Sequence, residues 1–148
     1  MKFIHLTDLH LPKPGEMLWG LDPHARLDAC LADIARHHAD AEFCVITGDL
    51  TERGEVAAYE ALRERLKGFP LPTHLRLGNH DDRANFLKVF GGADANGFAQ
   101  HTLRKDRRAF LFLDTLKGPP SSAGLYDAPR RAWLQSELAR SPGAGVVL

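Results

Sequence analysis

The first half of the chain alternates between short apolar runs and longer segments in which apolar residues recur every three or four positions. Residues 43–47 form the clearest short run, and residues 3–6 and 74–77 form two others. Such runs are typical of buried strands in a parallel sheet. Each run is followed at once by glycine or polar residues, so the pattern predicts three strands that end abruptly.

Apolar residues at helical spacing predict helices after these runs, over residues 22–38, 55–67 and 83–90, and a fourth helix over residues 127–139. Asp22 and Asp127 stand just before these helices with a proline close behind, an arrangement typical of a helix N-cap. The order strand, helix, strand, helix, strand predicts a parallel sheet with right-handed crossovers.

The second half of the chain has a different pattern. Residues 98–103 and 108–113 are predicted to form a hairpin that turns around Lys105 and Asp106. Residues 145–148 begin another apolar run, in which the sequence ends. A core strand seldom ends a protein, so we expect an α/β fold in which residues 1–148 are a single domain, incomplete at the C-terminus.

The segment over residues 7–20 contains several prolines and glycines, which prevent regular structure over much of its length. Met17, Leu18 and Trp19 are apolar residues within it. They could line a substrate pocket or pack the loop onto the domain, and the pattern alone favours packing.

Side chains suited to metal binding follow all three predicted strands of the first half: Asp8 and His10, then Asp49, then Asn79 and His80. In open α/β sheets, sites form outside the carboxyl ends of strands. Asp8 and His10 are two residues apart on extended backbone, so both can face one ion. Asp49 lies between the other two motifs in sequence, so we expect it to bridge that ion and a second one, to which Asn79 offers an amide oxygen.

This set of ligands suits hard or borderline metals, and two such ions about 3.5–4 Å apart are a common device for cleaving phosphate esters. The ions would hold a hydroxide, neutralise the phosphate and stabilise the departing oxygen. His80 follows Asn79 and is expected to point elsewhere, which suits a catalytic role as proton donor or in placing the phosphate. Each motif alone could be a turn, a cap or a surface pair, but their recurrence at three strand ends favours a metal site.

Two nearby cations, Arg53 and Arg83, could contact the substrate phosphate. Each could instead be a solvated charge at a helix end, which is the interpretation that we favour.

Composition narrows the function classes. The formal net charge of the 148 residues is zero, so no nucleic-acid or membrane partner is expected. Cys30 and Cys44 form no metal or redox motif. The sequence shows no signal peptide and no apolar run long enough to cross a bilayer, so we expect a cytoplasmic protein. Homo-oligomer formation is left open.

The motifs at residues 8–10, 48–54 and 78–81 resemble the first three blocks of the calcineurin-like metallophosphoesterases. Residues 7–10, 55–59 and 77–82 resemble the class III cyclic nucleotide phosphodiesterases and the related bacterial glycerophosphodiesterases. The resemblance implies a four-layer α/β/β/α sandwich, of which this chain is the N-terminal portion. It also implies two ions, each iron, manganese, zinc or cobalt, and a small-molecule phosphodiester substrate.

The same resemblance implies roles for individual residues. Asp8, His10 and Asp49 would bind the first ion, Asp49 and Asn79 the second, and His80 would donate a proton or position the phosphate. The family has further histidine blocks after the next core strand, beyond Leu148. We therefore expect the enzyme to be a metal-dependent phosphodiesterase. A monoesterase or nuclease on the same scaffold and a non-catalytic binding module are the alternatives.

Overall fold

The computed structural model describes residues 1–118, 121–141 and 145–147. Its first sheet consists of three parallel strands in the order β1 (Ile4–Thr7), β2 (Cys44–Thr47) and β3 (Thr73–Arg76). The parallel pairing confirms the prediction. Because β2 is the central strand, the loop that follows it lies between the loops that follow β1 and β3.

Helices α1 (Pro23–His37) and α2 (Val56–Leu66) connect these strands, and α3 (Arg83–Phe90) follows β3. Asp22 caps α1 as predicted, by accepting a 3.0 Å hydrogen bond from the amide of Ala25. The helices and the sheet share one apolar core, which includes Leu27, Leu31, Ile34, Ile46, Tyr59, Leu62 and Leu75. None of the helices in the described part of the chain is both long and apolar enough to cross a membrane.

The second sheet contains the predicted hairpin, formed by β4 (His101–Lys105) and β5 (Arg108–Phe112). β6 (Gly145–Val147) pairs with β5 in parallel, and Leu148 lies outside the described residues. β4 begins three residues later than residue 98, where we predicted it. The amides of Phe98 and Ala99 donate to the carboxylates of Asp94 and Asp114 instead of to a neighbouring strand.

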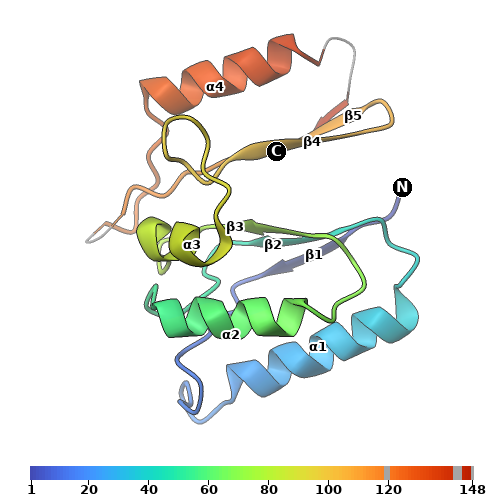
Figure 1. The fold of residues 1–148 in the computed structure, drawn as a ribbon, viewed down its shortest axis with the longest axis vertical. Helices are drawn as coiled ribbons and strands as arrows, with labels where there is room; N and C mark the ends of the chain where they lie inside the picture. The colour runs from blue at the N-terminus through green and yellow to red at the C-terminus, as the bar shows by residue number, and fades with distance from the viewer. Residues whose placement is uncertain (119–120, 142–144, 148) are drawn as a thin grey trace.

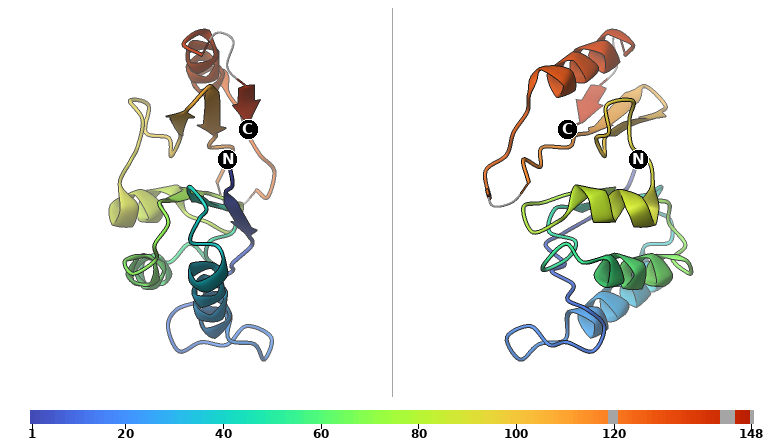
Figure 2. Two further views of the ribbon diagram at one scale, coloured as in Figure 1. Left: turned by 90° about the vertical axis from the view of Figure 1, so that its right-hand side faces the viewer. Right: turned by 60° about the vertical axis from the view of Figure 1, so that its left-hand side comes forward.

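Figure 1 shows how these elements form four layers. Helix α4 (Ala128–Ala139) covers the outer face of the second sheet, and α1 and α2 cover the outer face of the first. The side view in Figure 2 shows the same stacking, with the two sheets in the middle. The α/β/β/α arrangement expected from the resemblance is therefore confirmed.

The two sheets meet through aromatic side chains and a buried polar chain. Phe43 of the first sheet lies edge-on to Phe110 of the second, with ring centroids 5.0 Å apart. Beside them, the Arg76 guanidinium donates to Nδ1 of His101 at 3.1 Å. His101 therefore carries its proton on Nε2 and donates it to Nδ1 of His74 at 2.9 Å. Burial, together with the charge of Arg76, lowers the pKa of His101 to about 4.

Candidate metal centre

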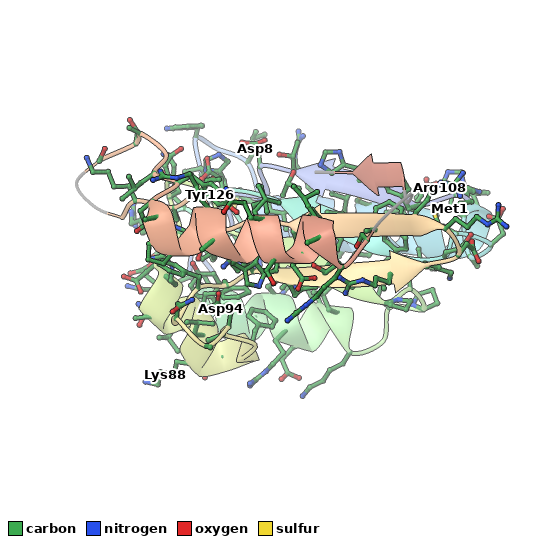
Figure 3. The ribbon with its side chains drawn as sticks, turned by 90° about the horizontal axis from the view of Figure 1, so that it is seen from above. Met1, Asp8, Lys88, Asp94, Arg108 and Tyr126 are labelled. Carbon is green, nitrogen blue, oxygen red and sulfur yellow. The ribbon has the colours of Figure 1, made fainter. Side chains whose placement is uncertain are left out.

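The loops after β1, β2 and β3 meet at one edge of the first sheet. The amide of His10 donates to the carbonyl of Asp49 at 2.8 Å, and the amide of His80 donates to Oδ1 of Asp49 at 2.9 Å. The loop after β2 is thus bonded to both of its neighbours, as its central position requires. Figure 3 places Asp8 on the β1 side of the molecule, opposite Lys88 of α3.

The backbone of this region adopts conformations that ordinary residues rarely take. Asp8, His10 and Asp49 have φ angles of 56°, 46° and 44°, in the left-handed region that favours glycine. Each such residue costs of order 1–3 kcal/mol and persists only where the surroundings hold it, as they commonly do at functional sites. Three of the predicted metal ligands therefore adopt strained backbone conformations.

Glycine is required at position 78 because the loops after β2 and β3 come very close there. A Cβ at Gly78 would lie 2.2 Å from both the backbone nitrogen and Oδ1 of Asp49. Real Cβ atoms do not approach other heavy atoms this closely. The absence of a side chain at Gly78 thus allows Asp49 to reach the loop after β3.

A buried carboxylate, Asp81, holds the same two loops together. It accepts hydrogen bonds from the amides of Leu50, Thr51 and Gly78 at 2.9–3.1 Å, and from the Tyr59 hydroxyl at 2.8 Å. Its pKa is raised because burial outweighs these hydrogen bonds. Sequence reasoning quoted Asp81 within a motif but assigned it no function. Leu50, Thr51 and Tyr59 come from distant segments, and no local pattern reveals these partners.

Side chains of His10, Asp49 and His80 form a compact cluster. One potential ligand atom from each lies within 4.8 Å of the others. Nε2 of His10 is 3.6 Å from Oδ2 of Asp49 and 3.9 Å from Oδ1 of Asp8. Two atoms that each bind an ion at about 2.0–2.2 Å can be at most about 4.4 Å apart. The separations from His10 to Asp49 and to Asp8 therefore fit a metal ion with nitrogen and oxygen ligands.

Glu52 orients both histidines of the cluster. Its carboxylate accepts a 2.8 Å hydrogen bond from Nδ1 of His10, and its backbone carbonyl accepts one of 2.9 Å from Nδ1 of His80. Each imidazole therefore keeps its Nε2 lone pair free. A carboxylate behind a ligating histidine is the usual support for a metal site. Sequence reasoning missed this role, for which the only signal was an acid three residues after Asp49.

His80, which we expect to point elsewhere than Asn79, lies beside His10. The hydrogen bonds to Asp49 and Glu52 turn its ring back toward His10, and the two ring centroids are 4.7 Å apart. The hydrogen bond to the Glu52 carbonyl, with the nearby charges of Asp49 and Glu52, raises the pKa of His80. From this position, an imidazole can bind an ion or hold a proton near the reacting phosphate.

Asn79, the remaining predicted ligand, lies in the same loop but is exposed. It lines a cavity of about 180 Å³ together with Thr115 and Ser122. Asn79 stays a predicted ligand, and its amide stands next in sequence to His80.

Of the two predicted cations, only Arg53 is a solvated charge. Its side chain is largely exposed, 3.5 Å from a carboxylate oxygen of Glu16. Arg83 corrects our interpretation, since it is neither solvated nor free to meet a phosphate. Its Nε and NH2 groups donate to the two carboxylate oxygens of Asp114, at 2.6 and 2.8 Å. This ion pair links α3 to the loop after β5.

The apolar loop residues also differ from the prediction. Trp19 is 86% exposed and Met17 is 58% exposed, so neither packs the loop onto the domain. Leu18 is half-buried and lines a cavity with Trp19. The favoured packing interpretation is therefore wrong for the two largest side chains.

Comparisons with known proteins agree with this geometry. The family described as calcineurin-like phosphoesterase matches residues 1–137. A probable cyclic nucleotide phosphodiesterase of Rhodopseudomonas palustris is 42% identical over 96% of this chain and 53% of its own length. A cAMP/cGMP dual specificity phosphodiesterase of Mycobacterium tuberculosis is 31% identical over 98% of the chain and 47% of its own length.

A probable glycerophosphodiester phosphodiesterase of Arcobacter nitrofigilis is 25% identical over the whole chain and 55% of its own length. The chain thus spans about half the length of the curated relatives that it matches. The family match extends over most of the sequence and includes every residue of the cluster. The chain belongs to the calcineurin-like phosphoesterase family.

Proposed function

We propose that this chain carries the metal-binding and proton-donating residues of a phosphodiesterase. The observation that supports this most strongly is the cluster of His10, Asp49 and His80 at the carboxyl edge of the parallel sheet. Relatives named as cyclic nucleotide and glycerophosphodiester phosphodiesterases support a small phosphodiester as the substrate.

In this proposal, Asp8 and His10 would bind one ion, Asn79 would bind a second, and Asp49 would bridge the two. The two carboxylate oxygens of Asp49 face different loops, since Oδ2 lies near His10 and Oδ1 accepts the amide hydrogen of His80. Two ions held in this way would activate water and neutralise the charge of the phosphate. The donor set admits iron, manganese, zinc or cobalt.

The other residues of the site orient the ligands or transfer a proton. Glu52 fixes the ring of His10 so that its Nε2 faces the ion, and it fixes the ring of His80 through its carbonyl. His80 then donates a proton to the departing alkoxide oxygen, a contribution of typically about 10²–10⁴-fold. Asp81 keeps the loops after β2 and β3 at the required separation.

The test measures turnover of paired mono- and diester nitrophenyl phosphates after loading with each metal. The proposal expects the diester to be hydrolysed faster, and His80→Ala to lower kcat without lowering metal content. Faster hydrolysis of the monoester would indicate a phosphomonoesterase. Metal binding without hydrolysis of either ester would indicate a binding module.

A further inference from the structure

A cavity of about 350 Å³ lies directly beside the candidate metal centre. Asp8 and His10 form part of its wall, and Arg26 of α1 adds a cationic side chain. The rest of the wall is mainly apolar and includes Leu6, Leu9, Leu18, Leu21, Leu27 and Cys30. Small-molecule sites are typically about 300–1,000 Å³ in volume and mostly apolar, with few polar groups. The cavity therefore fits the organic part of a ligand whose phosphate reaches Asp8 and His10.

Trp19 lines this cavity while 86% of its surface remains exposed. A tight turn presents it, because the amides of Leu18 and Leu21 donate to each other's carbonyls at 2.9 Å. Trp19 and Gly20 occupy the centre of the turn with φ angles of 48° and 78°. Positive φ at both central residues is typical of a type I′ turn, which favours asparagine or glycine.

A tryptophan at the first central position of this turn is therefore unfavourable for two reasons. Its bulky side chain disfavours the left-handed backbone, and its indole is left in water instead of in the core. Strained residues of this kind cluster at functional sites, where the surroundings hold them in place. The observation thus indicates that the indole has a use outside the core, at the mouth of the cavity.

We propose that Trp19 is a stacking surface for the base of a cyclic nucleotide whose phosphodiester lies at Asp8 and His10. This inference rests on the proposed phosphodiesterase function and chooses between its two substrate classes. Aromatic side chains stack on any nucleobase. The hydroxyl groups of a glycerol substituent would instead lose water against a wall that is mainly apolar. The guanidinium of Arg26 supplies donors for acceptor atoms of the base or phosphate.

Fluorescence tests the stacking without depending on turnover. The chain has two tryptophans, so Trp133→Phe leaves Trp19 as the only indole. Titration of metal-loaded Trp133→Phe protein with 3′,5′-cyclic AMP should quench the emission saturably, and glycerophosphoethanolamine should not. Trp19→Phe protein, which reports on Trp133, should show no saturable change. Equal responses to the two ligands, or a response of Trp133 alone, would overturn the proposal.

Affinity measurements by calorimetry provide the second test. Trp19→Ala should weaken binding of cyclic AMP by roughly 5- to 150-fold, the effect of losing one base–aromatic stack. Trp19→Phe should lose less. Met17→Ala is the matched control, because Met17 is an exposed apolar residue of the same loop that does not line the cavity. It should bind cyclic AMP like the unmodified chain.

Metal titration separates this proposal from the proposed function. If the chain binds metal and hydrolyses diesters but Trp19→Ala binds cyclic AMP normally, the stacking surface is wrong and the phosphodiesterase proposal stands. If no metal binds and no diester is hydrolysed, the phosphodiesterase proposal fails. The proposed stacking surface belongs to the site of that enzyme. This proposal then fails as well, even if cyclic AMP still quenches the emission of Trp19.

Discussion

Asp49 and Asp114 are both acids that follow strands of a central sheet, yet they have opposite surroundings. Asp49 follows β2 and lies beside the imidazole of His10, 3.6 Å from its Nε2. Asp114 follows β5, is fully buried, and accepts a pair of hydrogen bonds from Arg83. Two further amides, from Ala99 and Leu116, donate to Asp114 at 2.9 and 3.0 Å.

The two carboxylates differ in the groups that contact them and not in their position after a strand. Burial alone would raise the pKa of Asp114, but the hydrogen bonds and charge of Arg83 and the amide hydrogen bonds lower it. Its oxygens are thus fully occupied, and its charge is neutralised within the protein. Asp49 faces imidazoles whose other nitrogens are bound to Glu52, so its charge is available to a cation. Among the described residues, a guanidinium reaches Asp114 and none reaches Asp49, so of the two carboxylates we expect a metal ion only at Asp49.

Replacing Asp49 tests this comparison most directly and should have the largest effect. Asn tolerates the left-handed backbone of this position and can still accept from the His80 amide. Asp49→Asn should therefore keep the fold while losing more metal affinity than the roughly 10- to 100-fold expected for a residue that only orients a ligand. Metal content by mass spectrometry and unfolding in urea measure the two effects. Unchanged metal content would remove Asp49 from the site.

Asp114→Ala should produce the opposite result. Breaking a buried ion pair leaves an uncompensated charge and typically costs about 3–5 kcal/mol of folding stability. The charge left unpaired would be that of Arg83, together with that of Arg130, whose NH1 lies 3.8 Å from Asp114. Urea unfolding should show this loss, while the folded fraction should still bind metal. Asp22→Ala, which removes the cap of α1, is the control and should cost about 1 kcal/mol.

Acid should weaken the contact between the two sheets. The pKa of His101 is about 4 in the folded chain and about 6.5 when unfolded, so the unfolded state binds the extra proton first. Stability from the neutral imidazole is present above about pH 6.5 and is lost as the pH falls toward 4, by about 3 kcal/mol. His74, whose pKa burial also lowers, acts in the same direction.

Unfolding free energies measured between pH 4 and 7 test this expectation. His101→Gln removes the group with the larger shift and should make the curve clearly less steep over this range. His37→Gln, at the exposed end of α1, is the matched control and should leave the slope unchanged. An equally steep slope in His101→Gln would assign the acid sensitivity to other groups.

Replacing Glu52 should have the smallest effect of these changes. Glu52→Ala removes the acceptor for Nδ1 of His10 and should weaken metal binding about 10- to 100-fold. Glu52→Gln keeps an oxygen acceptor and should lose less. Calorimetric metal titration of both variants separates orientation from charge. Equal losses would show that the charge of Glu52, and not its hydrogen bond, supports His10.

The sequence predicts the helices and the parallel sheet because their signals are local. Asp22 and Asp127 cap helices as expected, and the apolar runs become β1, β2 and β3. The start of β4 could not be found in this way, because the carboxylate of Asp114, which binds the amide of Ala99, lies 15 residues further along the sequence.

The residues of the candidate site divide in the same way, into those that local signals indicate and those whose roles depend on contacts between distant segments. Asp8, His10 and Asp49 follow strands whose order puts them together, which the pattern of the chain can indicate. The roles of Glu52 and Asp81 depend on contacts between loops, with sequence separations of 28 to 42 residues for His10, His80, Leu50 and Thr51. Arg83 was misread for the same reason, since its partner Asp114 lies 31 residues away.

The close approach at Gly78 has a consequence for how this site can vary. Its missing side chain lets two loops share a space in which one added methyl group would displace the backbone of Asp49. Asp49 in turn is bonded to the amides of both His10 and His80, directly or through its carboxylate. The loops are therefore coupled, so that a change in their spacing at Gly78 would move them together. Any substitution at position 78 would shift several candidate ligands at once, so variation in the chemistry of this site must arise at its rim, where side chains can change singly.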